Sequence, residues 1–233
     1  MSNTQKCVPN PIKSTELVDF FHQNRDKLSD IKFLQEFIQR RAGLALNIVS
    51  LGIKREDVEP CWGNFRCKQL PHELAQFLAF LKQHSGDISS YLEIGIATGG
   101  TFILIDGFLR ATNESYRGSL GLELDNNVCL KLYGPYAQEY PSCKWIQIDS
   151  RFFEPQKQYD LWFIDGNHSY NFVLHDFNNA LKQAKYIAIH DIALMHDVKR
   201  IWKNIKDSYT DTWEFINEDP NFGKACGIGV VKI

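Results

Sequence analysis

Hydrophobic residues are spaced in two different patterns along this 233-residue chain, and the pattern changes near residue 88. Beyond that point, short apolar runs alternate with stretches of helical spacing. The apolar runs are 91–95, 119–123, 144–148, 161–165 and 186–190, and the helical stretches between them are 100–111, 126–138 and 169–184. Nearly continuous apolar strands that alternate with helices are typical of a parallel sheet covered on both faces. The pattern therefore predicts an α/β fold with a doubly wound sheet.

The chain ends with a predicted helix over 196–208 and two further strand candidates, 213–217 and 227–232. Only a short turn-rich segment joins these two strands. We therefore expect them to close the sheet as an antiparallel hairpin.

The residues before position 88 are predicted to be helical. Apolar residues recur at helical spacing over 15–27, 30–42 and 72–84. The expected N-caps are Ser14 for the first helix and Ser29-Asp30 for the second. Gly43 is expected to end the second helix, and Pro71 to occupy the first turn of the third.

Composition and charge exclude some classes of protein. The chain is 44% hydrophobic and 23% charged, which excludes a disordered or low-complexity protein. Residues 1–86 carry 12 basic and 9 acidic side chains, and residues 87–233 carry 14 and 19. Neither part has the basic excess that binding to a phosphate backbone usually needs, so we expect no nucleic-acid partner. We expect residues 1–86 to form a helical extension or cover, and residues 87–233 the core.

Nothing in the sequence suggests a membrane span or a secreted protein. No run approaches about 18 uncharged apolar residues, and residues 1–13 lack an apolar signal-peptide core. The six cysteines are too sparse for a disulfide scaffold, and Cys61 and Cys67 lie too far apart for a zinc knuckle. We therefore expect a cytoplasmic protein with reduced thiols.

Polar and glycine residues follow each of the first five predicted strands. In chain order they are Glu93-Ile-Gly95, Glu123, Asp149-Ser150, Asp165-Gly-Asn-His168 and His190-Asp191. Because right-handed crossovers bring the carboxyl ends of parallel strands to one edge, these residues should meet there. Ligands bind at this edge in doubly wound sheets.

The first of these strand ends leads into a glycine loop, Glu93–Thr101. Gly95 would allow a tight turn, and Gly99-Gly100 would let a ligand approach the amides of the next helix. The spacing G-x-x-x-G-G is neither the dinucleotide motif G-x-G-x-x-G nor a P-loop. Glu123 ends the second strand, where a carboxylate can accept both hydroxyls of a ribose; Asp125 is the competing candidate.

With these motifs, residues 88–233 resemble the class I S-adenosylmethionine-dependent methyltransferases. Their first motif matches Glu93–Thr101, their ribose-binding acid matches Glu123, and their adenine-contacting turn matches Asp149-Ser150. The resemblance implies S-adenosylmethionine as cofactor and a Rossmann-like sheet ordered 3-2-1-4-5-7-6, with strand seven antiparallel. The cofactor contacts that it implies are Glu93, Gly95, Ala97, Thr98, Gly99, Thr101, Glu123, Leu124, Asp149, Ser150 and Asp165.

The segments 159–170 and 189–192 resemble a narrower group, the sugar O-methyltransferases of macrocin and macrolide type and the cephalosporin-hydroxylase-like proteins. This resemblance implies a divalent metal ion, Mg²⁺ or Mn²⁺, held by Asp165, His190 and Asp191, with His168 as the base. His190 departs from the acidic residue of the family, and a nitrogen ligand suits Mn²⁺, Fe²⁺ or Zn²⁺ better than Mg²⁺.

The same residues make chemical sense for methyl transfer to oxygen. A cation held by carboxylates can bind an alcohol and lower its pKa, and an imidazole with a pKa near ~6.5 can accept its proton. Asp165 and His168 are therefore the expected catalytic residues. We expect an O-methyltransferase whose acceptor is a hydroxyl of a small molecule or glycan, most simply a sugar.

Other functions stay open from the sequence. The acceptor could be phenolic, or the chain could be a catalytically silent nucleoside-binding scaffold. A nicotinamide oxidoreductase is disfavoured because the dinucleotide motif is missing. The N-terminal helices could cover the cleft, build the acceptor site or form a homodimer contact. The polar residues of this region nearest the core are Arg66, Lys68, Gln69 and His72.

Overall fold

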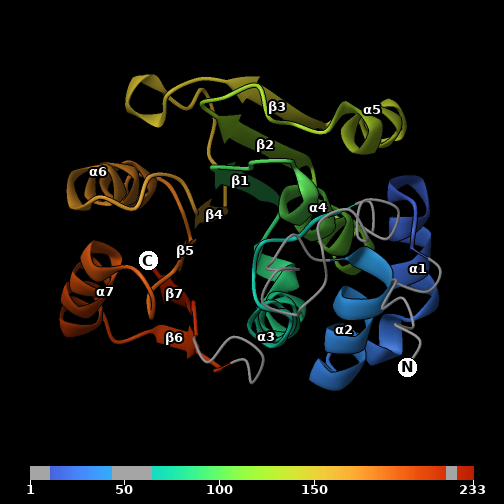
Figure 1. Ribbon diagram of the computed structural model, residues 1–233, viewed down its shortest axis with the longest axis horizontal. Coiled ribbons are helices and arrows are strands. Elements are labelled where there is room, and N and C mark those ends of the chain that lie inside the picture. Colours follow the sequence, from blue (N-terminus) through green and yellow to red (C-terminus); the bar gives the residue numbers. More distant parts are fainter. Residues whose placement is uncertain (1–10, 44–64, 219–224) are drawn as a thin grey trace, which may run out of the picture.

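A computed structural model describes residues 11–43, 65–218 and 225–233 and contains one seven-stranded sheet (Figure 1). From edge to edge its strands are β3 (Cys143–Gln147), β2 (Gly118–Glu123), β1 (Ser90–Ile94), β4 (Leu161–Ile164), β5 (Tyr186–His190), β7 (Ile228–Lys232) and β6 (Thr212–Phe215). Strands β1 to β5 run parallel to their neighbours, whereas β7 is antiparallel to β5 and to β6. The predicted strand order and the closing hairpin are confirmed.

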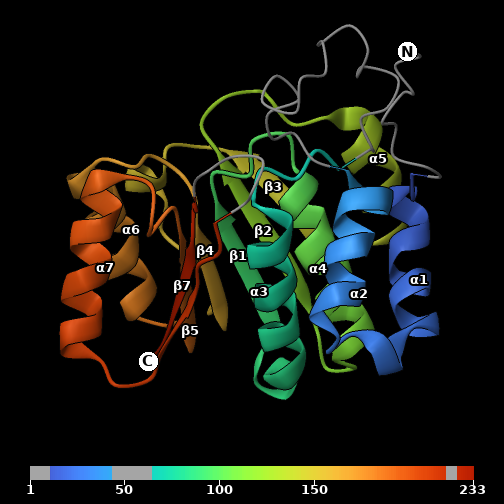
Figure 2. The same cartoon turned by 60° about the horizontal axis from the view of Figure 1, so that its bottom comes forward.

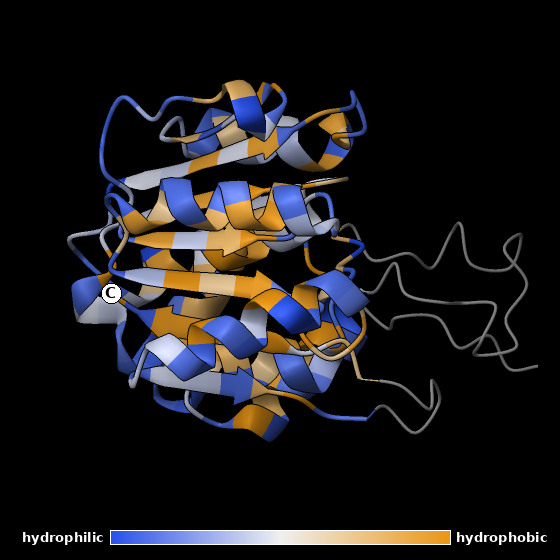
Figure 3. Ribbon diagram, turned by 90° about the vertical axis from the view of Figure 1, so that its left-hand side faces the viewer, coloured by the Kyte–Doolittle hydropathy of each residue, from blue (hydrophilic) through white to orange (hydrophobic). Residues whose placement is uncertain are grey.

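Helices cover both faces of the sheet (Figures 1 and 2). Helices α6 (Tyr170–Leu181) and α7 (His196–Ser208) lie on one face. The other face carries α3 (Pro71–Gln83), α4 (Gly100–Thr112) and α5 (Leu130–Glu139), with α1 (Leu17–Gln23) and α2 (Ile31–Phe37) packed outside α4 and α3. Strands β1, β4 and β5 are buried along their whole length between these layers, which explains their continuous apolar runs. In Figure 3 the strands are mostly white to orange, while the helices alternate between blue and orange.

The N-terminal helices are shorter than predicted. The stretch 15–27 divides into a 3₁₀ turn (Ser14–Glu16), α1 and a second 3₁₀ turn (Arg25–Lys27). The stretch 30–42 is α2 followed by one π-helical turn (Ile38–Ala42). Another 3₁₀ turn (Ser85–Asp87) follows α3. Even so, α1 packs tightly on the core, where the rings of Phe21 and Phe108 meet edge to face at 5.2 Å. The two parts of the chain therefore share one apolar core.

Three of the four predicted helix boundaries are confirmed. The Asp30 carboxylate accepts hydrogen bonds from the first turn of α2, Gly43 ends the π-helical turn at φ +85°, and Pro71 is the first residue of α3. Ser14 is not an N-cap. Its hydroxyl instead donates to the carbonyl of Leu132 in α5, at 2.9 Å, and so joins the N-terminal segment to the core.

One core helix begins later than expected. The stretch 126–138 was predicted to be helical, but α5 starts at Leu130. The reason lies in the loop before it, where the Cys129 amide donates to the Thr98 carbonyl at 3.0 Å. Residues 126–129 therefore support the glycine loop instead of adding a helical turn.

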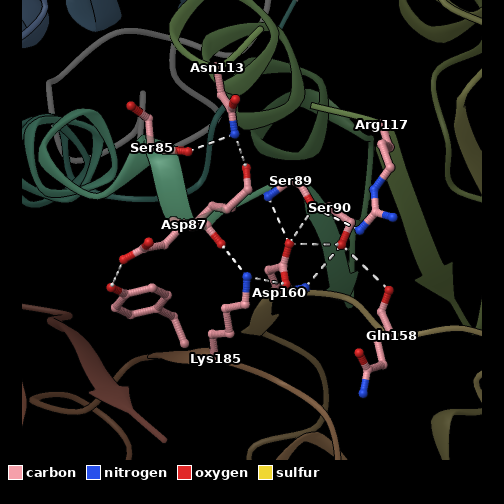
Figure 4. Close-up of polar contacts among 11 residues, drawn as sticks. Ser85, Asp87, Ser89, Ser90, Asn113, Arg117, Gln158, Asp160 and Lys185 are labelled. Carbon is pink, nitrogen blue, oxygen red and sulfur yellow. Dashed lines mark hydrogen bonds and ion pairs between the residues drawn. The ribbon is translucent and has the colours of Figure 1, made fainter. Parts of the chain in front are cut away.

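A polar network holds the amino-terminal edge of the sheet together (Figure 4). The Asp160 carboxylate, just before β4, accepts from the Ser89 amide at 2.8 Å and pairs with Lys185 at 3.0 Å. Ser89 precedes β1 and Lys185 precedes β5, so one acid links three strands. This edge lies opposite the carboxyl ends where the functional residues were expected.

The described residues contain no helix that is both long and apolar enough to span a bilayer. Their cysteines, Cys67, Cys129, Cys143 and Cys226, are all free thiols. Cys61 lies outside the described residues.

A second buried acid stabilises the helical face. Asp106 in α4 is inaccessible to solvent, and its carboxylate accepts from Arg110 Nε at 2.5 Å, Tyr136 Oη and Ser119 Oγ at 2.7 Å, and Tyr116 Oη at 2.8 Å. These donors come from α4, α5, β2 and the loop between α4 and β2. Because a buried charge needs such partners, Asp106 joins these elements around one point.

We predict that Asp106→Ala lowers the free energy of unfolding by about 3–5 kcal/mol, since it leaves Arg110 and three hydroxyls without their acceptor. Urea unfolding measures the change. Glu114→Ala is the matched control: its exposed carboxylate lies 3.8 Å from Arg25, and its loss should cost less than about 1 kcal/mol. Similar losses in the two variants would contradict a stabilising role for the Asp106 cluster.

Candidate active site

The predicted functional residues meet at the carboxyl ends of the parallel strands, around a cavity of about 660 Å³. Those that line it are Gly95, Ala97, Glu123, Leu124, Asp149, Ser150, Asp165, His168, His190 and Asp191. Glu93, Thr98 and Thr101 line a small recess beside it instead, and Gly99 lines neither. The sheet edge thus gathers residues from five strand ends into one space, as doubly wound sheets generally do.

The glycine loop is shaped by close backbone contacts. Gly95 has φ +86°, and a Cβ on it would lie 2.3 Å from the Asp165 carbonyl oxygen. Glycine therefore lets β1 end directly against the end of β4. Gly99, also at φ +86°, precedes the first turn of α4.

Gly100 has a different role from the one predicted. A Cβ on Gly100 would lie 1.4 Å from the Phe65 carbonyl oxygen. Its missing side chain thus makes room for the N-terminal segment and not for a ligand. The same segment continues through Cys67 to Gln69, so the cover packs directly on the glycine loop.

Glu123 is fixed by backbone amides. Its carboxylate accepts from Ala97 N at 2.5 Å, Leu124 N at 3.1 Å and Asp125 N at 3.2 Å, and the residue is 9% exposed. The acid thus ties the glycine loop to the end of β2 while facing the cavity. This orientation fits a carboxylate that accepts hydrogen bonds from a ligand.

The far end of the cavity is polar and aromatic. Ser150 begins a 3₁₀ turn (Ser150–Phe152) that is capped by the Asp149 side chain. Hydrogen bonds from Arg151 lower the pKa of Asp149, and the Arg151 guanidinium lies 4.3 Å from the Phe172 ring centre. Phe172 also lines the cavity, so this end offers a flat apolar surface bordered by charge.

Glu93 is a buried acid rather than a cavity-lining one. It is 1% exposed and accepts a hydrogen bond from the Tyr91 hydroxyl. Burial raises the pKa of Glu93 well above its usual value, and the charges of Asp165 and Glu123 raise it further, although the Tyr91 hydrogen bond opposes them. Glu93 is therefore a buried acid beneath the loop, in surroundings that favour its neutral form.

Two acids and two histidines form a compact group where β4 and β5 end. His190 Nδ1 lies 2.9 Å from Asp165 Oδ1, and His168 Nε2 lies 2.9 Å from Asp191 Oδ2 and 3.8 Å from Asp165 Oδ1. The His168 contact with Asp191 is an ion pair whose alignment is poor for a hydrogen bond. Asp191 has φ +63°, an uncommon conformation for a residue with a side chain. Strain of this kind concentrates at functional sites.

The opposite charges in this group shift the pKa values of Asp165, His168 and His190 toward their charged forms. Burial would raise the pKa of Asp165, but the charge of His190, its hydrogen bond and the nearby His168 outweigh it and lower the pKa to about 2. The nearby carboxylates of Asp165 and Asp191 raise the pKa of His168 to about 9, against the effect of burial. For His190, burial lowers the pKa, yet Asp165 more than compensates and the net shift is upward. The unperturbed pKa expected for His168 therefore does not apply, and this histidine carries a proton at neutral pH.

The loop that carries His168 is anchored from α7. The Tyr170 amide at the start of α6 donates to Asp197 Oδ2 at 3.0 Å, and the Ser169 amide donates to Asn167 Oδ1 at 2.9 Å. Asp197 lies in the first turn of α7, yet its carboxylate serves the neighbouring helix. Helix α7 therefore helps to hold His168 in place.

Sequence reasoning did not assign Gln69 to the site. Its side chain is buried, donates from Nε2 to Asp165 Oδ2 at 2.7 Å and accepts from the Thr101 hydroxyl. The only signal was its position just before the core. Of its polar neighbours, Lys68 lines the cavity, whereas His72 contacts Gln35 on α2 at 3.1 Å.

Several side chains of this group could ligate a metal ion. Asp165, His168 and Asp191 each offer a ligand atom, and these atoms lie within 4.8 Å of one another. His190 Nδ1 also lies close to both acids, 2.9 Å from Asp165 Oδ1 and 3.6 Å from Asp191 Oδ2. The set of Asp165, His190 and Asp191 therefore stays a prediction, and His168 is a further candidate ligand beside it.

We predict that His168 titrates near pH 9 in chelator-treated protein, whereas His84, whose pKa is lowered mainly by burial, titrates below 6.5. Asp191→Asn should shift the His168 pKa toward about 6.5, because it removes one of the two carboxylates that favour the imidazolium. NMR detection of the ring nitrogens measures both residues in one sample. A His168 value below that of His84 would contradict the charge arrangement described above.

Comparisons with known proteins bear on the fold. No family model and no curated protein matches the sequence. The O-methyltransferase TomG from Streptomyces achromogenes, in complex with SAM, aligns with a TM-score of 0.51 at 14% identity, over 82% of this chain and 87% of that one. A protein described as an O-methyltransferase from Klebsiella pneumoniae gives 0.51 and 17%, over 68% and 78%.

A third solved structure, described as an RNA methyltransferase from Pyrococcus horikoshii, aligns with a TM-score of 0.54 at 13% identity, over 87% of this chain and 98% of that one. Identities this low support a shared fold and leave the substrate open. Together with the observed strand order, they show that the chain has the class I S-adenosylmethionine-dependent methyltransferase fold.

Proposed function

We propose that this protein is an S-adenosylmethionine-dependent O-methyltransferase that acts on a hydroxyl of a small molecule or glycan, most simply a sugar. One observation supports this proposal above the others. The amide-fixed Glu123, the turn at Ser150 and the Asp165–His168–Asp191 group all open onto one cavity. They do so in a fold shared with solved methyltransferases.

The residues that line the cavity suggest how the cofactor would lie in it. Glu123 would accept the ribose hydroxyls, and Ser150 with Phe172 would contain the adenine. The methionine part would then lie over Gly95 toward Asp165. A volume of about 660 Å³ is in the range of cavities that enclose a small-molecule ligand.

The acceptor would bind beyond the sulfonium, beside Asp191 and His168. Asp191 is 5% exposed and turns a carboxylate toward the cavity, and Asn167 adds an amide. Carboxylates and amides that converge in this way suit a ligand with several hydroxyl groups. This polar end favours a sugar over a phenol.

Methyl transfer would proceed in line from the sulfonium carbon to the acceptor oxygen. The carbon–sulfur bond breaks as the carbon–oxygen bond forms, and the hydroxyl proton passes to the His168 imidazole and then to solvent. Because the pKa of His168 is raised to about 9, this residue accepts a proton only after losing its own. We therefore expect turnover without added metal to increase toward alkaline pH.

The residues present also fit the divalent metal ion that the family resemblance implies. Asp165, His168 and Asp191 supply two carboxylates and one imidazole, which suits Mn²⁺ better than Mg²⁺. When bound, the ion supplies a positive charge that lowers the pKa of an acceptor hydroxyl. Gln69 and His190 would then orient Asp165.

We predict that Glu123→Gln weakens binding of S-adenosylmethionine by about ten- to hundredfold, the loss expected when a charged hydrogen bond of about 1.5–3 kcal/mol is removed. Isothermal titration calorimetry measures the affinity. Asp125→Asn is the matched control, because Asp125 lines the same cavity and was the competing candidate for the ribose. Failure of the wild-type protein to bind S-adenosylmethionine would reject the proposed function.

We predict that the wild-type protein methylates a component of a sugar mixture, and that His168→Ala reduces the rate by at least about a hundredfold. Affinity for S-adenosylmethionine should stay close to that of the wild type, which separates loss of the base from loss of the cofactor site. Mass spectrometry of the products measures turnover, with phenols and RNA as parallel acceptors. Turnover of RNA or phenol alone would reject a sugar acceptor, and binding without turnover of any acceptor would favour a silent scaffold.

A further inference from the structure

His190 has two chemically different sides. Its Nδ1 is hydrogen-bonded to Asp165 at 2.9 Å, so this nitrogen is committed to the site described above. Its Nε2 is buried and has no hydrogen-bond partner. Buried polar atoms in proteins almost always have a partner, so an unpaired ring nitrogen points to a missing ligand.

Two other ligand-type side chains approach His190 away from Asp165. Glu73, on α3, is inaccessible to solvent, and Cys226, just before β7, is 6% exposed. One carboxylate, one imidazole and one thiol atom from these three residues lie within 4.8 Å of one another. They come from α3, β5 and the segment leading into β7, three elements that pack together (Figure 1).

The Glu73 carboxylate faces the backbone that leads into β7. Its Oε1 accepts from the Asn217 amide at 3.1 Å, and the Gly227 and Cys226 backbone also lowers its pKa, although burial raises it more. No hydrogen bond or ion pair joins Glu73 directly to His190, although both lie in the described part of the chain. The unpaired His190 Nε2 is therefore the buried polar atom of this group that lacks a partner, and leaving it unsatisfied would cost stability.

We propose that Glu73, His190 and Cys226 form a buried binding site for a zinc ion. The donor set of oxygen, nitrogen and sulfur suits Zn²⁺ and disfavours Mg²⁺. The Asp165–His190 hydrogen bond fits this assignment. Histidines that ligate zinc usually donate their other ring N–H to a carboxylate, which fixes the tautomer and frees Nε2 for the metal.

This site differs from the cation site in front of it. The front group contains Asp165, His168 and Asp191 and has no sulfur, whereas the rear group contains the Cys226 thiol and Glu73, which does not line the cavity. The rear group would receive its metal once the Cys226 thiol and the His190 imidazole lose their protons. A zinc ion there would hold His190, and through it the orientation of Asp165. The zinc proposal does not depend on methyl transfer.

Cobalt provides a direct test on the full-length protein. Metal-free protein titrated with Co²⁺ should develop tetrahedral visible bands and a thiolate-to-cobalt charge-transfer absorption in the near ultraviolet, and Zn²⁺ should abolish both. Cys226→Ser should remove the charge-transfer absorption, and Glu73→Gln should weaken binding by at least about tenfold. Cys143→Ala, which removes a buried thiol in β3, and His168→Ala should keep the absorption.

Three results would overturn the proposal. They are no charge-transfer absorption in the wild-type protein, retention of it in Cys226→Ser, and loss of it in His168→Ala, which would mean that His168 and not Glu73 completes the site of the thiolate-bound ion. X-ray absorption of the zinc-loaded wild-type protein adds a test that needs no variant. It should show one sulfur at about 2.3 Å and nitrogen or oxygen at about 2.0–2.1 Å, and a shell without sulfur would reject the site.

Discussion

The pairing of one buried carboxylate organises the functional end of this molecule. Asp165 lies at the end of β4, and its two oxygens receive hydrogen bonds from Gln69 and His190. A buried charge is tolerated only when such partners surround it, so the sheet, the β5 terminus and the N-terminal segment must come together for Asp165 to stay ionised. Cover and core are therefore coupled at the site, and Asp165 connects them.

Much of the fold followed from the sequence because the strands are buried on both faces. Such strands are apolar throughout, and their order follows from the methyltransferase-like motifs at their ends. Local chemistry limited the prediction elsewhere. The start of α5 depends on a hydrogen bond between Cys129 and Thr98, which lie 31 positions apart. The spacing of hydrophobic residues cannot predict a hydrogen bond between residues so far apart in the sequence.

The sequence predicted which residues line the cavity better than it predicted what each of their side chains contacts. Strand ends identified the residues that share the cavity, because topology alone brings them together. The direction of each ring was not encoded in this way: His190 uses Nδ1 to contact Asp165 and leaves Nε2 buried without a hydrogen bond. Gly100 likewise accommodates Phe65 and not a ligand. Such facts depend on tertiary neighbours that a single strand-end motif does not specify.

The anchor between Asp197 and Tyr170 has a mechanical consequence. The loop that presents His168 is short, and its far end is tied to the first turn of α7 rather than to the sheet. A displacement of α7, for example when a large molecule presses on its outer surface, would pull the base away from its aspartates. The helix thus acts as a lever arm, and distant contacts on it could tune proton acceptance without touching the cavity.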